Sequence, residues 1–249
     1  MDRRVMSNLS IVIPCYNEPE NIPLVIKSLK SITNDLSFAL EVIIVDGASN
    51  DGTQDVLKQE FKTLDKNIFK LILQENRNGY GFDIIEGLKA SSYEVLAWTH
   101  ADMQTDINDV IKGFNLYKTH SEKDNNLNVF VKGQRKGRKP LDAILTFGMQ
   151  VITFLILRVN IHDINAQPKI FSRTFFEECI KDKAPKDFSL DLFALIQTKR
   201  IRSTIISFPV LFQPRILGEA KGGGGSLKNR ISLISRTFKY ILKLKNILN

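Results

Sequence analysis

Residues 40–53 read LEVIIVDGASNDGT, an apolar, β-branched run that ends on Asp46 and continues into Gly, Ser and Asn. The run predicts a buried strand, and the residues after it predict a loop. Similar strands are expected at residues 9–14, 68–74 and 93–99. Helical spacing of apolar residues fits residues 21–33, 51–61, 80–91 and 106–117. This alternation predicts an α/β fold with a mostly parallel sheet flanked by helices.

The second half of the chain has a less regular pattern. A strand is expected at residues 128–132, followed by a basic loop that contains Arg135, Lys136 and Arg138. Residues 141–159 predict a long apolar helix, but its charge-free part is shorter than the roughly 20 residues that spanning a membrane requires. We therefore expect this helix in the core or docked on the surface. A helix at residues 187–200 and a strand at residues 203–212 follow.

The composition is that of an ordinary globular protein, with 43% hydrophobic and 25% charged residues among 249. It excludes a disordered or collagen-like chain. The two cysteines, Cys15 and Cys179, make no disulfide framework and favour a reducing compartment. Residues 1–10 contain no apolar segment, so no signal peptide is expected.

The formal net charge of +8 is concentrated at the C-terminal end. Residues 220–249 contain Lys and Arg but no acid, so the rest of the chain is nearly neutral and is not expected to bind nucleic acid. Residues 222–226, GGGGS, predict a flexible hinge. We expect three parts: a domain at 1–221, the hinge at 222–226, and a basic amphipathic helix at 227–249. That helix suits an anionic membrane surface, and the alternative is a helix that packs back on the domain.

Three of the predicted strands end in polar loops, which read PCYNE at 14–18, DGASNDGT at 46–53 and HADMQ at 100–104. The carboxyl ends of parallel strands meet at one sheet edge, where the ligands of such sheets bind. The aromatic ring and carboxylates of the first two loops suit a base and a ribose, and the third loop is expected near the phosphates. A dinucleotide-binding oxidoreductase is disfavoured because no G-x-G-x-x-G follows the first strand.

The segments PCYNEPENI, VDGASNDGT and HADMQ resemble the successive motifs of family 2 glycosyltransferases, which have the GT-A fold. Residues 163–173 (DINAQPKIFSR), 188–192 (FSLDL) and 208–221 are similar to segments of the dolichyl- and polyprenyl-phosphate sugar transferases. The resemblance covers about residues 9–221. It implies an inverting enzyme that moves a sugar from a nucleotide-diphosphate donor to a polyprenyl-phosphate, glycan or glycolipid acceptor in cell-surface polysaccharide assembly, at the cytoplasmic face of the membrane.

The resemblance also implies a divalent cation, Mg²⁺ or Mn²⁺, at the third loop. Asp102 matches the last acid of the family's metal motif, and Gln104 matches the glutamine after it. His100 stands where the family usually has an aspartate, and we expect it to ligate the metal or to contact the sugar or diphosphate. Capping of the next helix is expected from Asp106 rather than from Asp102.

For the donor, the resemblance implies contacts from the first two loops. Pro14, Tyr16 and Glu18 are expected at the base or ribose, and so is Asp46. Gly47 replaces the family's second acid, which often reads the base, so the donor base is left open. Candidate phosphate-binding cations are Arg135, Arg215 and Lys221. Arg77, Gly79 and Gly81 resemble a glycine-rich segment of the family that permits close backbone approach.

A sugar hydroxyl acceptor requires a general base, whereas a phosphate acceptor is already anionic. Asp191 matches the acid of the FSLDL segment and is the candidate base, with Asp187 and Asp163 as further candidates. Both acceptor classes stay open at this point. A non-catalytic nucleotide-sugar-binding or scaffold protein is a further alternative, because His100 and Gly47 interrupt two acidic motifs.

Overall fold

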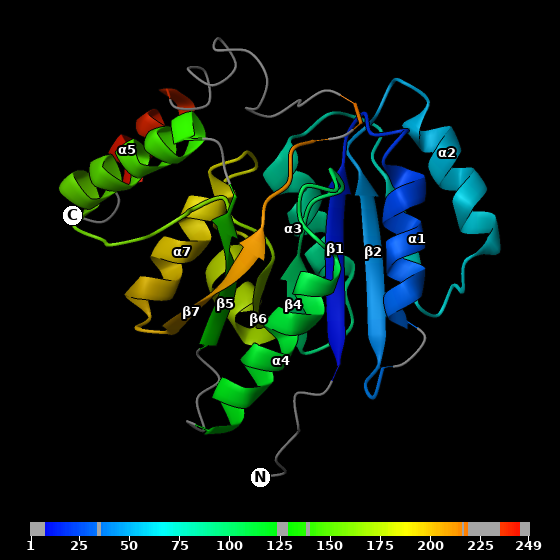
Figure 1. The fold of residues 1–249 in the computed structure, drawn as a ribbon, viewed down its shortest axis with the longest axis horizontal. Coiled ribbons are helices and arrows are strands. Elements are labelled where there is room, and N and C mark those ends of the chain that lie inside the picture. Colours follow the sequence, from blue (N-terminus) through cyan, green and yellow to red (C-terminus); the bar gives the residue numbers. More distant parts are fainter. Residues whose placement is uncertain are drawn as a thin grey trace.

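The computed structural model describes residues 8–33, 36–123, 129–137, 140–215, 217–218 and 235–244. These residues form one seven-stranded sheet with the strand order β3-β2-β1-β4-β6-β5-β7 (Figure 1). The strands are β1 Leu9–Cys15, β2 Leu40–Asp46, β3 Phe69–Leu73, β4 Val95–Trp98, β5 Val129–Lys136, β6 Lys169–Ser172 and β7 Thr204–Leu211.

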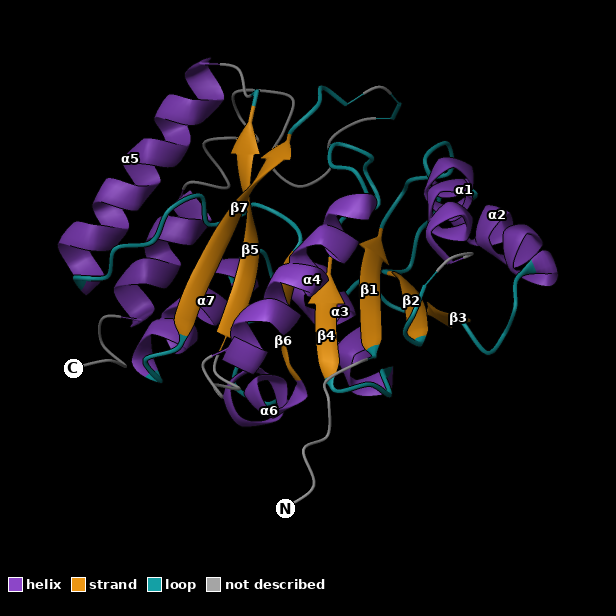
Figure 2. Ribbon diagram, turned by 60° about the horizontal axis from the view of Figure 1, so that its bottom comes forward, coloured by secondary structure: helices purple, strands orange, loops and turns teal. Residues whose placement is uncertain are grey.

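Helices cover both faces of this sheet (Figure 2). They are α1 Ile22–Thr33, α2 Thr53–Glu60, α3 Tyr80–Ala90, α4 Asn108–Lys123, α5 Pro140–Leu157, α6 Arg173–Phe175 and α7 Leu190–Arg200, with the short helices η1 Phe61–Thr63 and η2 Phe176–Ile180. A further helix is described at residues 235–244 and is called the tail helix below. The expected α/β architecture is therefore confirmed.

Each face of the sheet carries its own hydrophobic core. On β1, Ile11 and Ile13 pack with α1 and α4, whereas Val12 between them packs with α3 and α7. Successive side chains of a strand point to opposite faces, so a strand buried on both faces must be apolar throughout. This is why the continuous runs in β1 and β2 are wholly buried.

The strand β6 was not predicted from the sequence. It is four residues long and lies between β4 and β5, antiparallel to both. The other strand pairs, β1 with β2 and β4, β2 with β3, and β5 with β7, are parallel. The sheet is thus mostly parallel, as expected, with one strand reversed in its middle.

The predicted end of β5 is wrong. The strand continues to Lys136, and its last residues pair with β7, Arg135 opposite Val210 and Lys136 opposite Leu211. Arg135 and Lys136 therefore lie on a strand and not in a loop. The partner strand is about 75 residues away in sequence, so no local pattern indicated the longer ladder. Arg138 lies outside the described residues.

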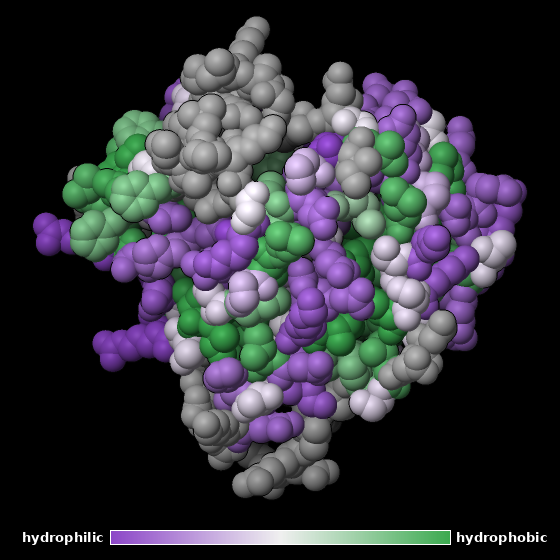
Figure 3. Space-filling view, in the orientation of Figure 1, coloured by the Kyte–Doolittle hydropathy of each residue, from purple (hydrophilic) through white to green (hydrophobic). Residues whose placement is uncertain are grey.

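The predicted apolar helix is α5, and it is only partly covered. Ile152 and Ile156 contact the core, whereas Phe147, Phe154 and Leu155 are 64%, 53% and 69% exposed. Figure 3 shows an apolar patch on the surface over α5. Among the described residues, none of the helices combines the length and the apolar character that crossing a membrane requires.

The tail helix packs on the domain through one face. Ile241 and Leu244 are buried in the same core as α3 and α7, while Phe238 and Leu242 are 38% and 42% exposed. Part of its apolar face therefore belongs to the core, as expected for a helix that packs back on the domain. The hinge at 222–226 and the candidate Lys221 lie outside the described residues.

Candidate functional site

The loops that follow β1 and β2 are tied together at the carboxyl edge of the sheet. The backbone N–H of Asn17 donates to Ser49 Oγ at 2.8 Å, and that of Glu18 donates to Thr53 Oγ1 at 2.9 Å. Side-chain bonds between Asn17 and Asn50 add to these contacts. The two loops that sequence analysis assigned to one site therefore form a single structure.

Asp46 organises the loop that follows it. Its carboxylate is fully buried and accepts from Ser49 N at 2.9 Å, from Ser49 Oγ at 2.5 Å and from Gln54 Nε2 at 2.8 Å. Buried carboxylates need such donors, and these ones come from the protein itself. Its expected contact with the base or ribose stays a prediction. Pro14 is buried in β1, one residue before Cys15, the residue that pairs with Asp46.

Glu18 and Arg215, which were predicted separately, are in contact. Arg215 Nη2 donates to Glu18 Oε2, and Asn21 Nδ2 donates to the same oxygen at 2.6 Å. Burial raises the pKa of Glu18, while these two donors act to lower it. A pocket of about 200 Å³ beside the pair is lined by Asn17, Glu18, Pro19, Glu20, Asn21, Asp51 and Gly218. The segment after β7 therefore closes onto the loop after β1.

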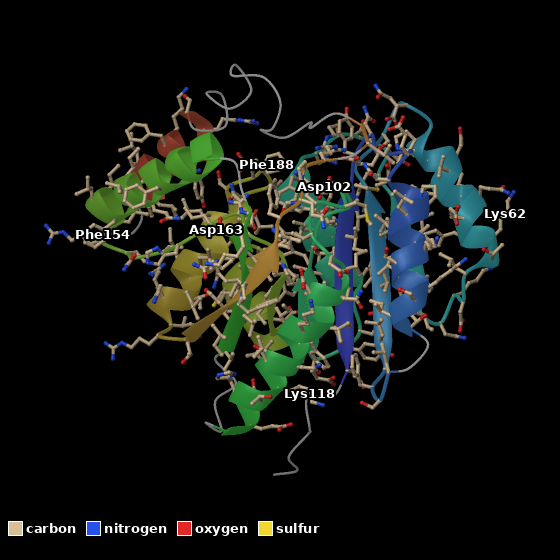
Figure 4. All side chains as sticks on the ribbon, in the orientation of Figure 1. Lys62, Asp102, Lys118, Phe154, Asp163 and Phe188 are labelled. Carbon is tan, nitrogen blue, oxygen red and sulfur yellow. The ribbon has the colours of Figure 1, made fainter. Side chains whose placement is uncertain are left out.

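Asp102 and His100 lie together after β4. His100 Nδ1 is 3.7 Å from Asp102 Oδ2, and the backbone N–H of Gln104 donates to Asp102 Oδ1 at 3.1 Å. Burial acts to raise the pKa of Asp102, but the hydrogen bond and charge of His100 outweigh it and hold this pKa below its usual value. Figure 4 shows Asp102 and Phe188 near the upper ends of the strands. Asp106 caps α4 as predicted, by accepting from Asn108 N at 2.9 Å.

This donor set fits a divalent cation that takes most of its ligands from a substrate. In the described part of the chain, no three His, Cys, Asp or Glu side chains are grouped as a metal site. Asp102 and His100 offer one carboxylate and one imidazole, a mixture that suits Mn²⁺ better than Mg²⁺. The Gln104 amide donates to Gln213 O at 3.1 Å and so ties this loop to the segment after β7.

A buried polar network that sequence analysis missed connects His100 to Asp191. Tyr80 OH lies 2.9 Å from His100 Nε2, and Gln167 Nε2 donates both to Tyr80 OH at 3.3 Å and to Asp191 Oδ1 at 3.1 Å. Lys169 Nζ donates to the same Asp191 oxygen. Asp191 is 1% exposed, so the candidate general base lies beneath the site and carries a buried ion pair.

Arg135 is likewise engaged by a protein carboxylate. Its Nε donates to Asp163 Oδ1 at 2.9 Å, and its backbone N–H donates to Asp163 Oδ2 at 2.7 Å. The structure thus joins two candidates, a phosphate-binding cation and a general base, to one another. Their predicted roles stay untested.

Arg77 covers the ring of Tyr16 in the first loop. The guanidinium carbon lies 4.0 Å from the ring centroid, and Nη1 donates to Asp83 Oδ2 at 2.8 Å. Asp83 lies in the first turn of α3 and is 1% exposed. Burial raises its pKa to about 6, although Arg77 acts to lower it. An acid in the first turn of a helix is explained by its favourable interaction with the helix end. The sequence therefore offered no reason to place Asp83 at the site.

Comparison with known proteins agrees with the motifs. The model of the family "Glycosyl transferase family 2" matches residues 10–180. An undecaprenyl-phosphate 4-deoxy-4-formamido-L-arabinose transferase from Pectobacterium atrosepticum is 30% identical over 99 residues, 40% of this chain and 30% of that protein. The protein of that name from Salmonella choleraesuis is 28% identical over 103 residues, 41% of this chain and 31% of that protein. The matches thus span less than a third of these curated relatives.

Solved structures share the fold over almost the whole chain. Glucosyl-3-phosphoglycerate synthase from Mycobacterium tuberculosis, in complex with Mn²⁺, UDP-glucose and phosphoglyceric acid, has a TM-score of 0.75 at 15% identity, over 96% of this chain and 80% of that one. The same protein with Mg²⁺ and UDP has a TM-score of 0.68 at 16% identity, over 96% of this chain and 79% of that one. The α/β sheet described above is therefore GT-A-like.

Proposed function

This chain belongs to glycosyl transferase family 2, as its motifs predicted, and we propose that it moves a sugar from a nucleotide-diphosphate donor to an acceptor with inversion at the anomeric carbon. The observation that carries the proposal is the contact of Asp102 with His100 at the end of β4. The joined loops after β1 and β2 and the Arg215 segment lie at the same edge. The solved structures with UDP-glucose and Mn²⁺ support such a donor.

The residues at this edge fit the charge changes of sugar transfer. The acceptor attacks the anomeric carbon opposite the diphosphate, and negative charge develops on the leaving oxygen. Asp102 and His100, with Gln104 nearby, would hold a divalent cation, which would neutralise that charge. Arg215 brings a guanidinium to the same edge and is held there by Glu18. The expected contact between Lys221 and a phosphate stays a prediction.

Purified full-length protein tests the function directly. We expect release of UDP or GDP from one of the corresponding sugar donors with Mn²⁺ or Mg²⁺, and loss of that release in EDTA. Stable nucleotide binding without any turnover, across donors and acceptors, would instead support the non-catalytic binding or scaffold alternative. Full turnover in EDTA would contradict the metal part of the proposal.

For the acceptor we propose a polyprenyl phosphate in the assembly of cell-surface polysaccharide. The names of the matched relatives, undecaprenyl-phosphate sugar transferases, support this class. The structure adds that Asp191 is buried against Lys169, and an anionic phosphate acceptor needs no general base. A sugar hydroxyl of a glycan or glycolipid is the second candidate. Transfer of labelled sugar to polyprenyl phosphate, and not to free glycans, would separate the two.

We further propose peripheral association with an anionic membrane surface, at the inner face of the cell membrane. Arg236, Lys239 and Lys243 of the tail helix are exposed, as are its Phe238 and Leu242. Each cation near an anionic surface adds about 1 kcal/mol of binding free energy. Because Ile241 and Leu244 are buried, the exposed apolar residues of α5 described above would have to supply much of the lipid contact.

A further inference from the structure

Asp191 is the end point of the buried network beneath the site. It is 1% exposed, and its Oδ1 accepts hydrogen bonds from Lys169 Nζ and from Gln167 Nε2. An ionised carboxylate only accepts hydrogen bonds, so each polar neighbour must turn a donor toward it. One buried charge therefore sets the direction of the hydrogen bonds in this network.

Gln167 shows how strictly that direction is imposed. Its amide nitrogen donates to Asp191 Oδ1 at 3.1 Å and to Tyr80 OH at 3.3 Å, which uses both of its N–H groups. Its Oε1 is buried and has no hydrogen-bond partner among the described residues. A buried acceptor without a donor costs stability, but the opposite orientation of the amide would place Oε1 against the Asp191 carboxylate. The Tyr80 oxygen therefore accepts from Gln167.

Tyr80 lies between this network and His100, and its ring is held in place. The ring stacks on Phe188 with 4.5 Å between the centroids and 8° between the planes. The backbone N–H of Phe82 donates to Lys186 O at 3.0 Å, so the start of α3 is joined to the segment that carries Phe188. The Tyr80 hydroxyl, 2.9 Å from His100 Nε2, is therefore fixed in position.

The hydroxyl proton of Tyr80 has two acceptors within reach, the Asp191 carboxylate and His100 Nε2. Burial raises the pKa of Tyr80 well above its usual value, and the charge of Asp191 and a hydrogen bond to it act in the same direction. A hydrogen bond to an ionised acceptor is roughly twice as strong as one between neutral groups. The proton therefore goes to Asp191, and the Tyr80 oxygen is left to accept from His100.

This direction decides which nitrogen of His100 carries a proton. A neutral imidazole has one N–H, and when that group is Nε2–H, Nδ1 keeps its lone pair. Nδ1 lies 3.7 Å from Asp102 Oδ2, which is too long for a hydrogen bond. Two ligands that are each about 2.1 Å from one cation lie about 3–4 Å apart, so the spacing suits a shared cation.

We propose that Tyr80, with its proton directed to the buried Asp191, holds His100 in the Nε2–H tautomer and so presents the Nδ1 lone pair to a cation beside Asp102. Histidines that ligate metals commonly donate their other N–H to a carboxylate, and here a tyrosine hydroxyl makes that link. Tyr80 and Asp191 are positioning residues. The inference rests on the proposed function, which supplies the cation.

NMR of the imidazole nitrogens in ¹⁵N-labelled full-length protein reads the tautomer without metal or substrate. At about pH 8, well above the usual pKa of an imidazole, we expect His100 to carry its proton on Nε2. His120 is the internal control of the opposite kind, because its Nδ1 lies 2.9 Å from Leu116 O and a carbonyl only accepts. The His100 signals are those that His100→Asn loses. Tyr80→Phe should remove the preference of His100 for Nε2–H and leave His120 unchanged.

Mn²⁺ binding tests the consequence for the cation. Mn²⁺ is titrated by calorimetry into the full-length protein with UDP or GDP present, and the same titration without protein is subtracted. Tyr80→Phe keeps the ring that stacks on Phe188, so the fold should persist by circular dichroism, but we expect it to weaken Mn²⁺ binding about tenfold or more. Tyr93→Phe removes a hydroxyl just before β4, at the other end of that strand from His100, and should bind Mn²⁺ as the original protein does.

A double variant separates positioning from packing. His100→Asp replaces the imidazole by a shorter carboxylate that does not reach the Tyr80 hydroxyl. In that background Tyr80→Phe should leave the Mn²⁺ affinity unchanged, because no tautomer remains to be set. An equal loss in both backgrounds would show that Tyr80 supports the site by packing alone, and the inference would be wrong.

Two further results would overturn the inference while the proposed function stands. One is a proton on Nδ1 of His100 in the original protein. The other is a Tyr80→Phe variant that binds Mn²⁺ as tightly as the original protein. If Mn²⁺ does not bind the original protein with either diphosphate, the metal part of the proposed function fails, and this inference fails with it.

Discussion

The two halves of the sheet hold their charged residues in different ways. Among the charged and polar groups near the ends of β3, β2, β1 and β4, Arg77 and His100 keep side chains that are 37% and 28% exposed. In the β6–β5–β7 half, Lys169 and Asp191 pair at 0% and 2% side-chain exposure. The pairs of the first half thus keep a partly exposed member, whereas this pair of the second half is wholly buried. A motif match alone does not distinguish these situations.

Breaking the buried pair should give the largest effect on stability. Lys169→Met leaves Asp191 buried without its cation, and we expect a loss of about 3–5 kcal/mol in the free energy of unfolding. Lys181→Met, which removes the exposed partner of Glu177, is the control and should cost far less stability. Urea denaturation followed by circular dichroism measures both.

A double variant separates ion pairing from packing at this position. Lys169→Met with Asp191→Leu removes both charges, so most of the lost stability should return. A loss below about 1 kcal/mol for Lys169→Met alone would show that the second half does not depend on this pair, and the contrast between the two halves would fail.

The elements that local sequence encodes were predicted well. The continuous apolar runs of β1 and β2 are buried on both faces, which is the one environment that such runs tolerate. The strand β6, with four residues, is too short to show a period of its own. The extension of β5 depends on β7, and a ladder between distant segments leaves no local signal.

The same distinction applies to the candidate site. The loops after the strands, with Asp102 and Glu18, lie at one edge as expected because a parallel sheet brings its strand ends together, and the roles of these residues stay predictions. The departure at Gly47 was visible in the sequence, but Asp83, which fills the resulting space, lies 36 residues away on a helix. The inward face of the tail helix could not be predicted either, since amphipathic spacing shows that a face is apolar and not what it contacts.

A smaller effect, confined to a pH window, should come from Asp83. Its pKa in the folded protein is raised to about 6, so folding disfavours its charged form. Between about pH 4 and pH 6 the unfolded chain gives up this proton first, and stability therefore falls as pH rises through that window. Asp83→Asn removes the effect, so its stability advantage over the original protein should grow by about 2 kcal/mol from pH 4 to pH 7.

The comparison is made from urea unfolding of both proteins at each pH. Subtracting the two curves cancels the contributions of the groups that the two proteins share. A difference that stays constant from pH 4 to pH 7 would show that Asp83 titrates as an exposed acid does.

The smallest expected effect concerns the tail helix. Reversing its exposed cations, with Arg236→Glu, Lys239→Glu and Lys243→Glu, should reduce binding to anionic vesicles by at least about tenfold. The fold should persist because Ile241 and Leu244 are unchanged. The control reverses three exposed lysines in and after α2, with Lys58→Glu, Lys62→Glu and Lys66→Glu, and so carries the same net charge. Equal vesicle binding by both triple variants would leave the tail helix as a packing element only.

The most direct measurement of the central claim is sugar transfer or donor hydrolysis by Asp102→Asn beside Asp106→Asn. Both variants lose one carboxylate within five residues, but Asp102 faces His100 and the sheet edge, whereas Asp106 caps α4. We predict that Asp102→Asn lowers kcat by about a hundredfold or more, with the fold intact by circular dichroism. We predict that Asp106→Asn keeps most of its activity. Equal activity of the two variants would contradict a catalytic centre at the end of β4.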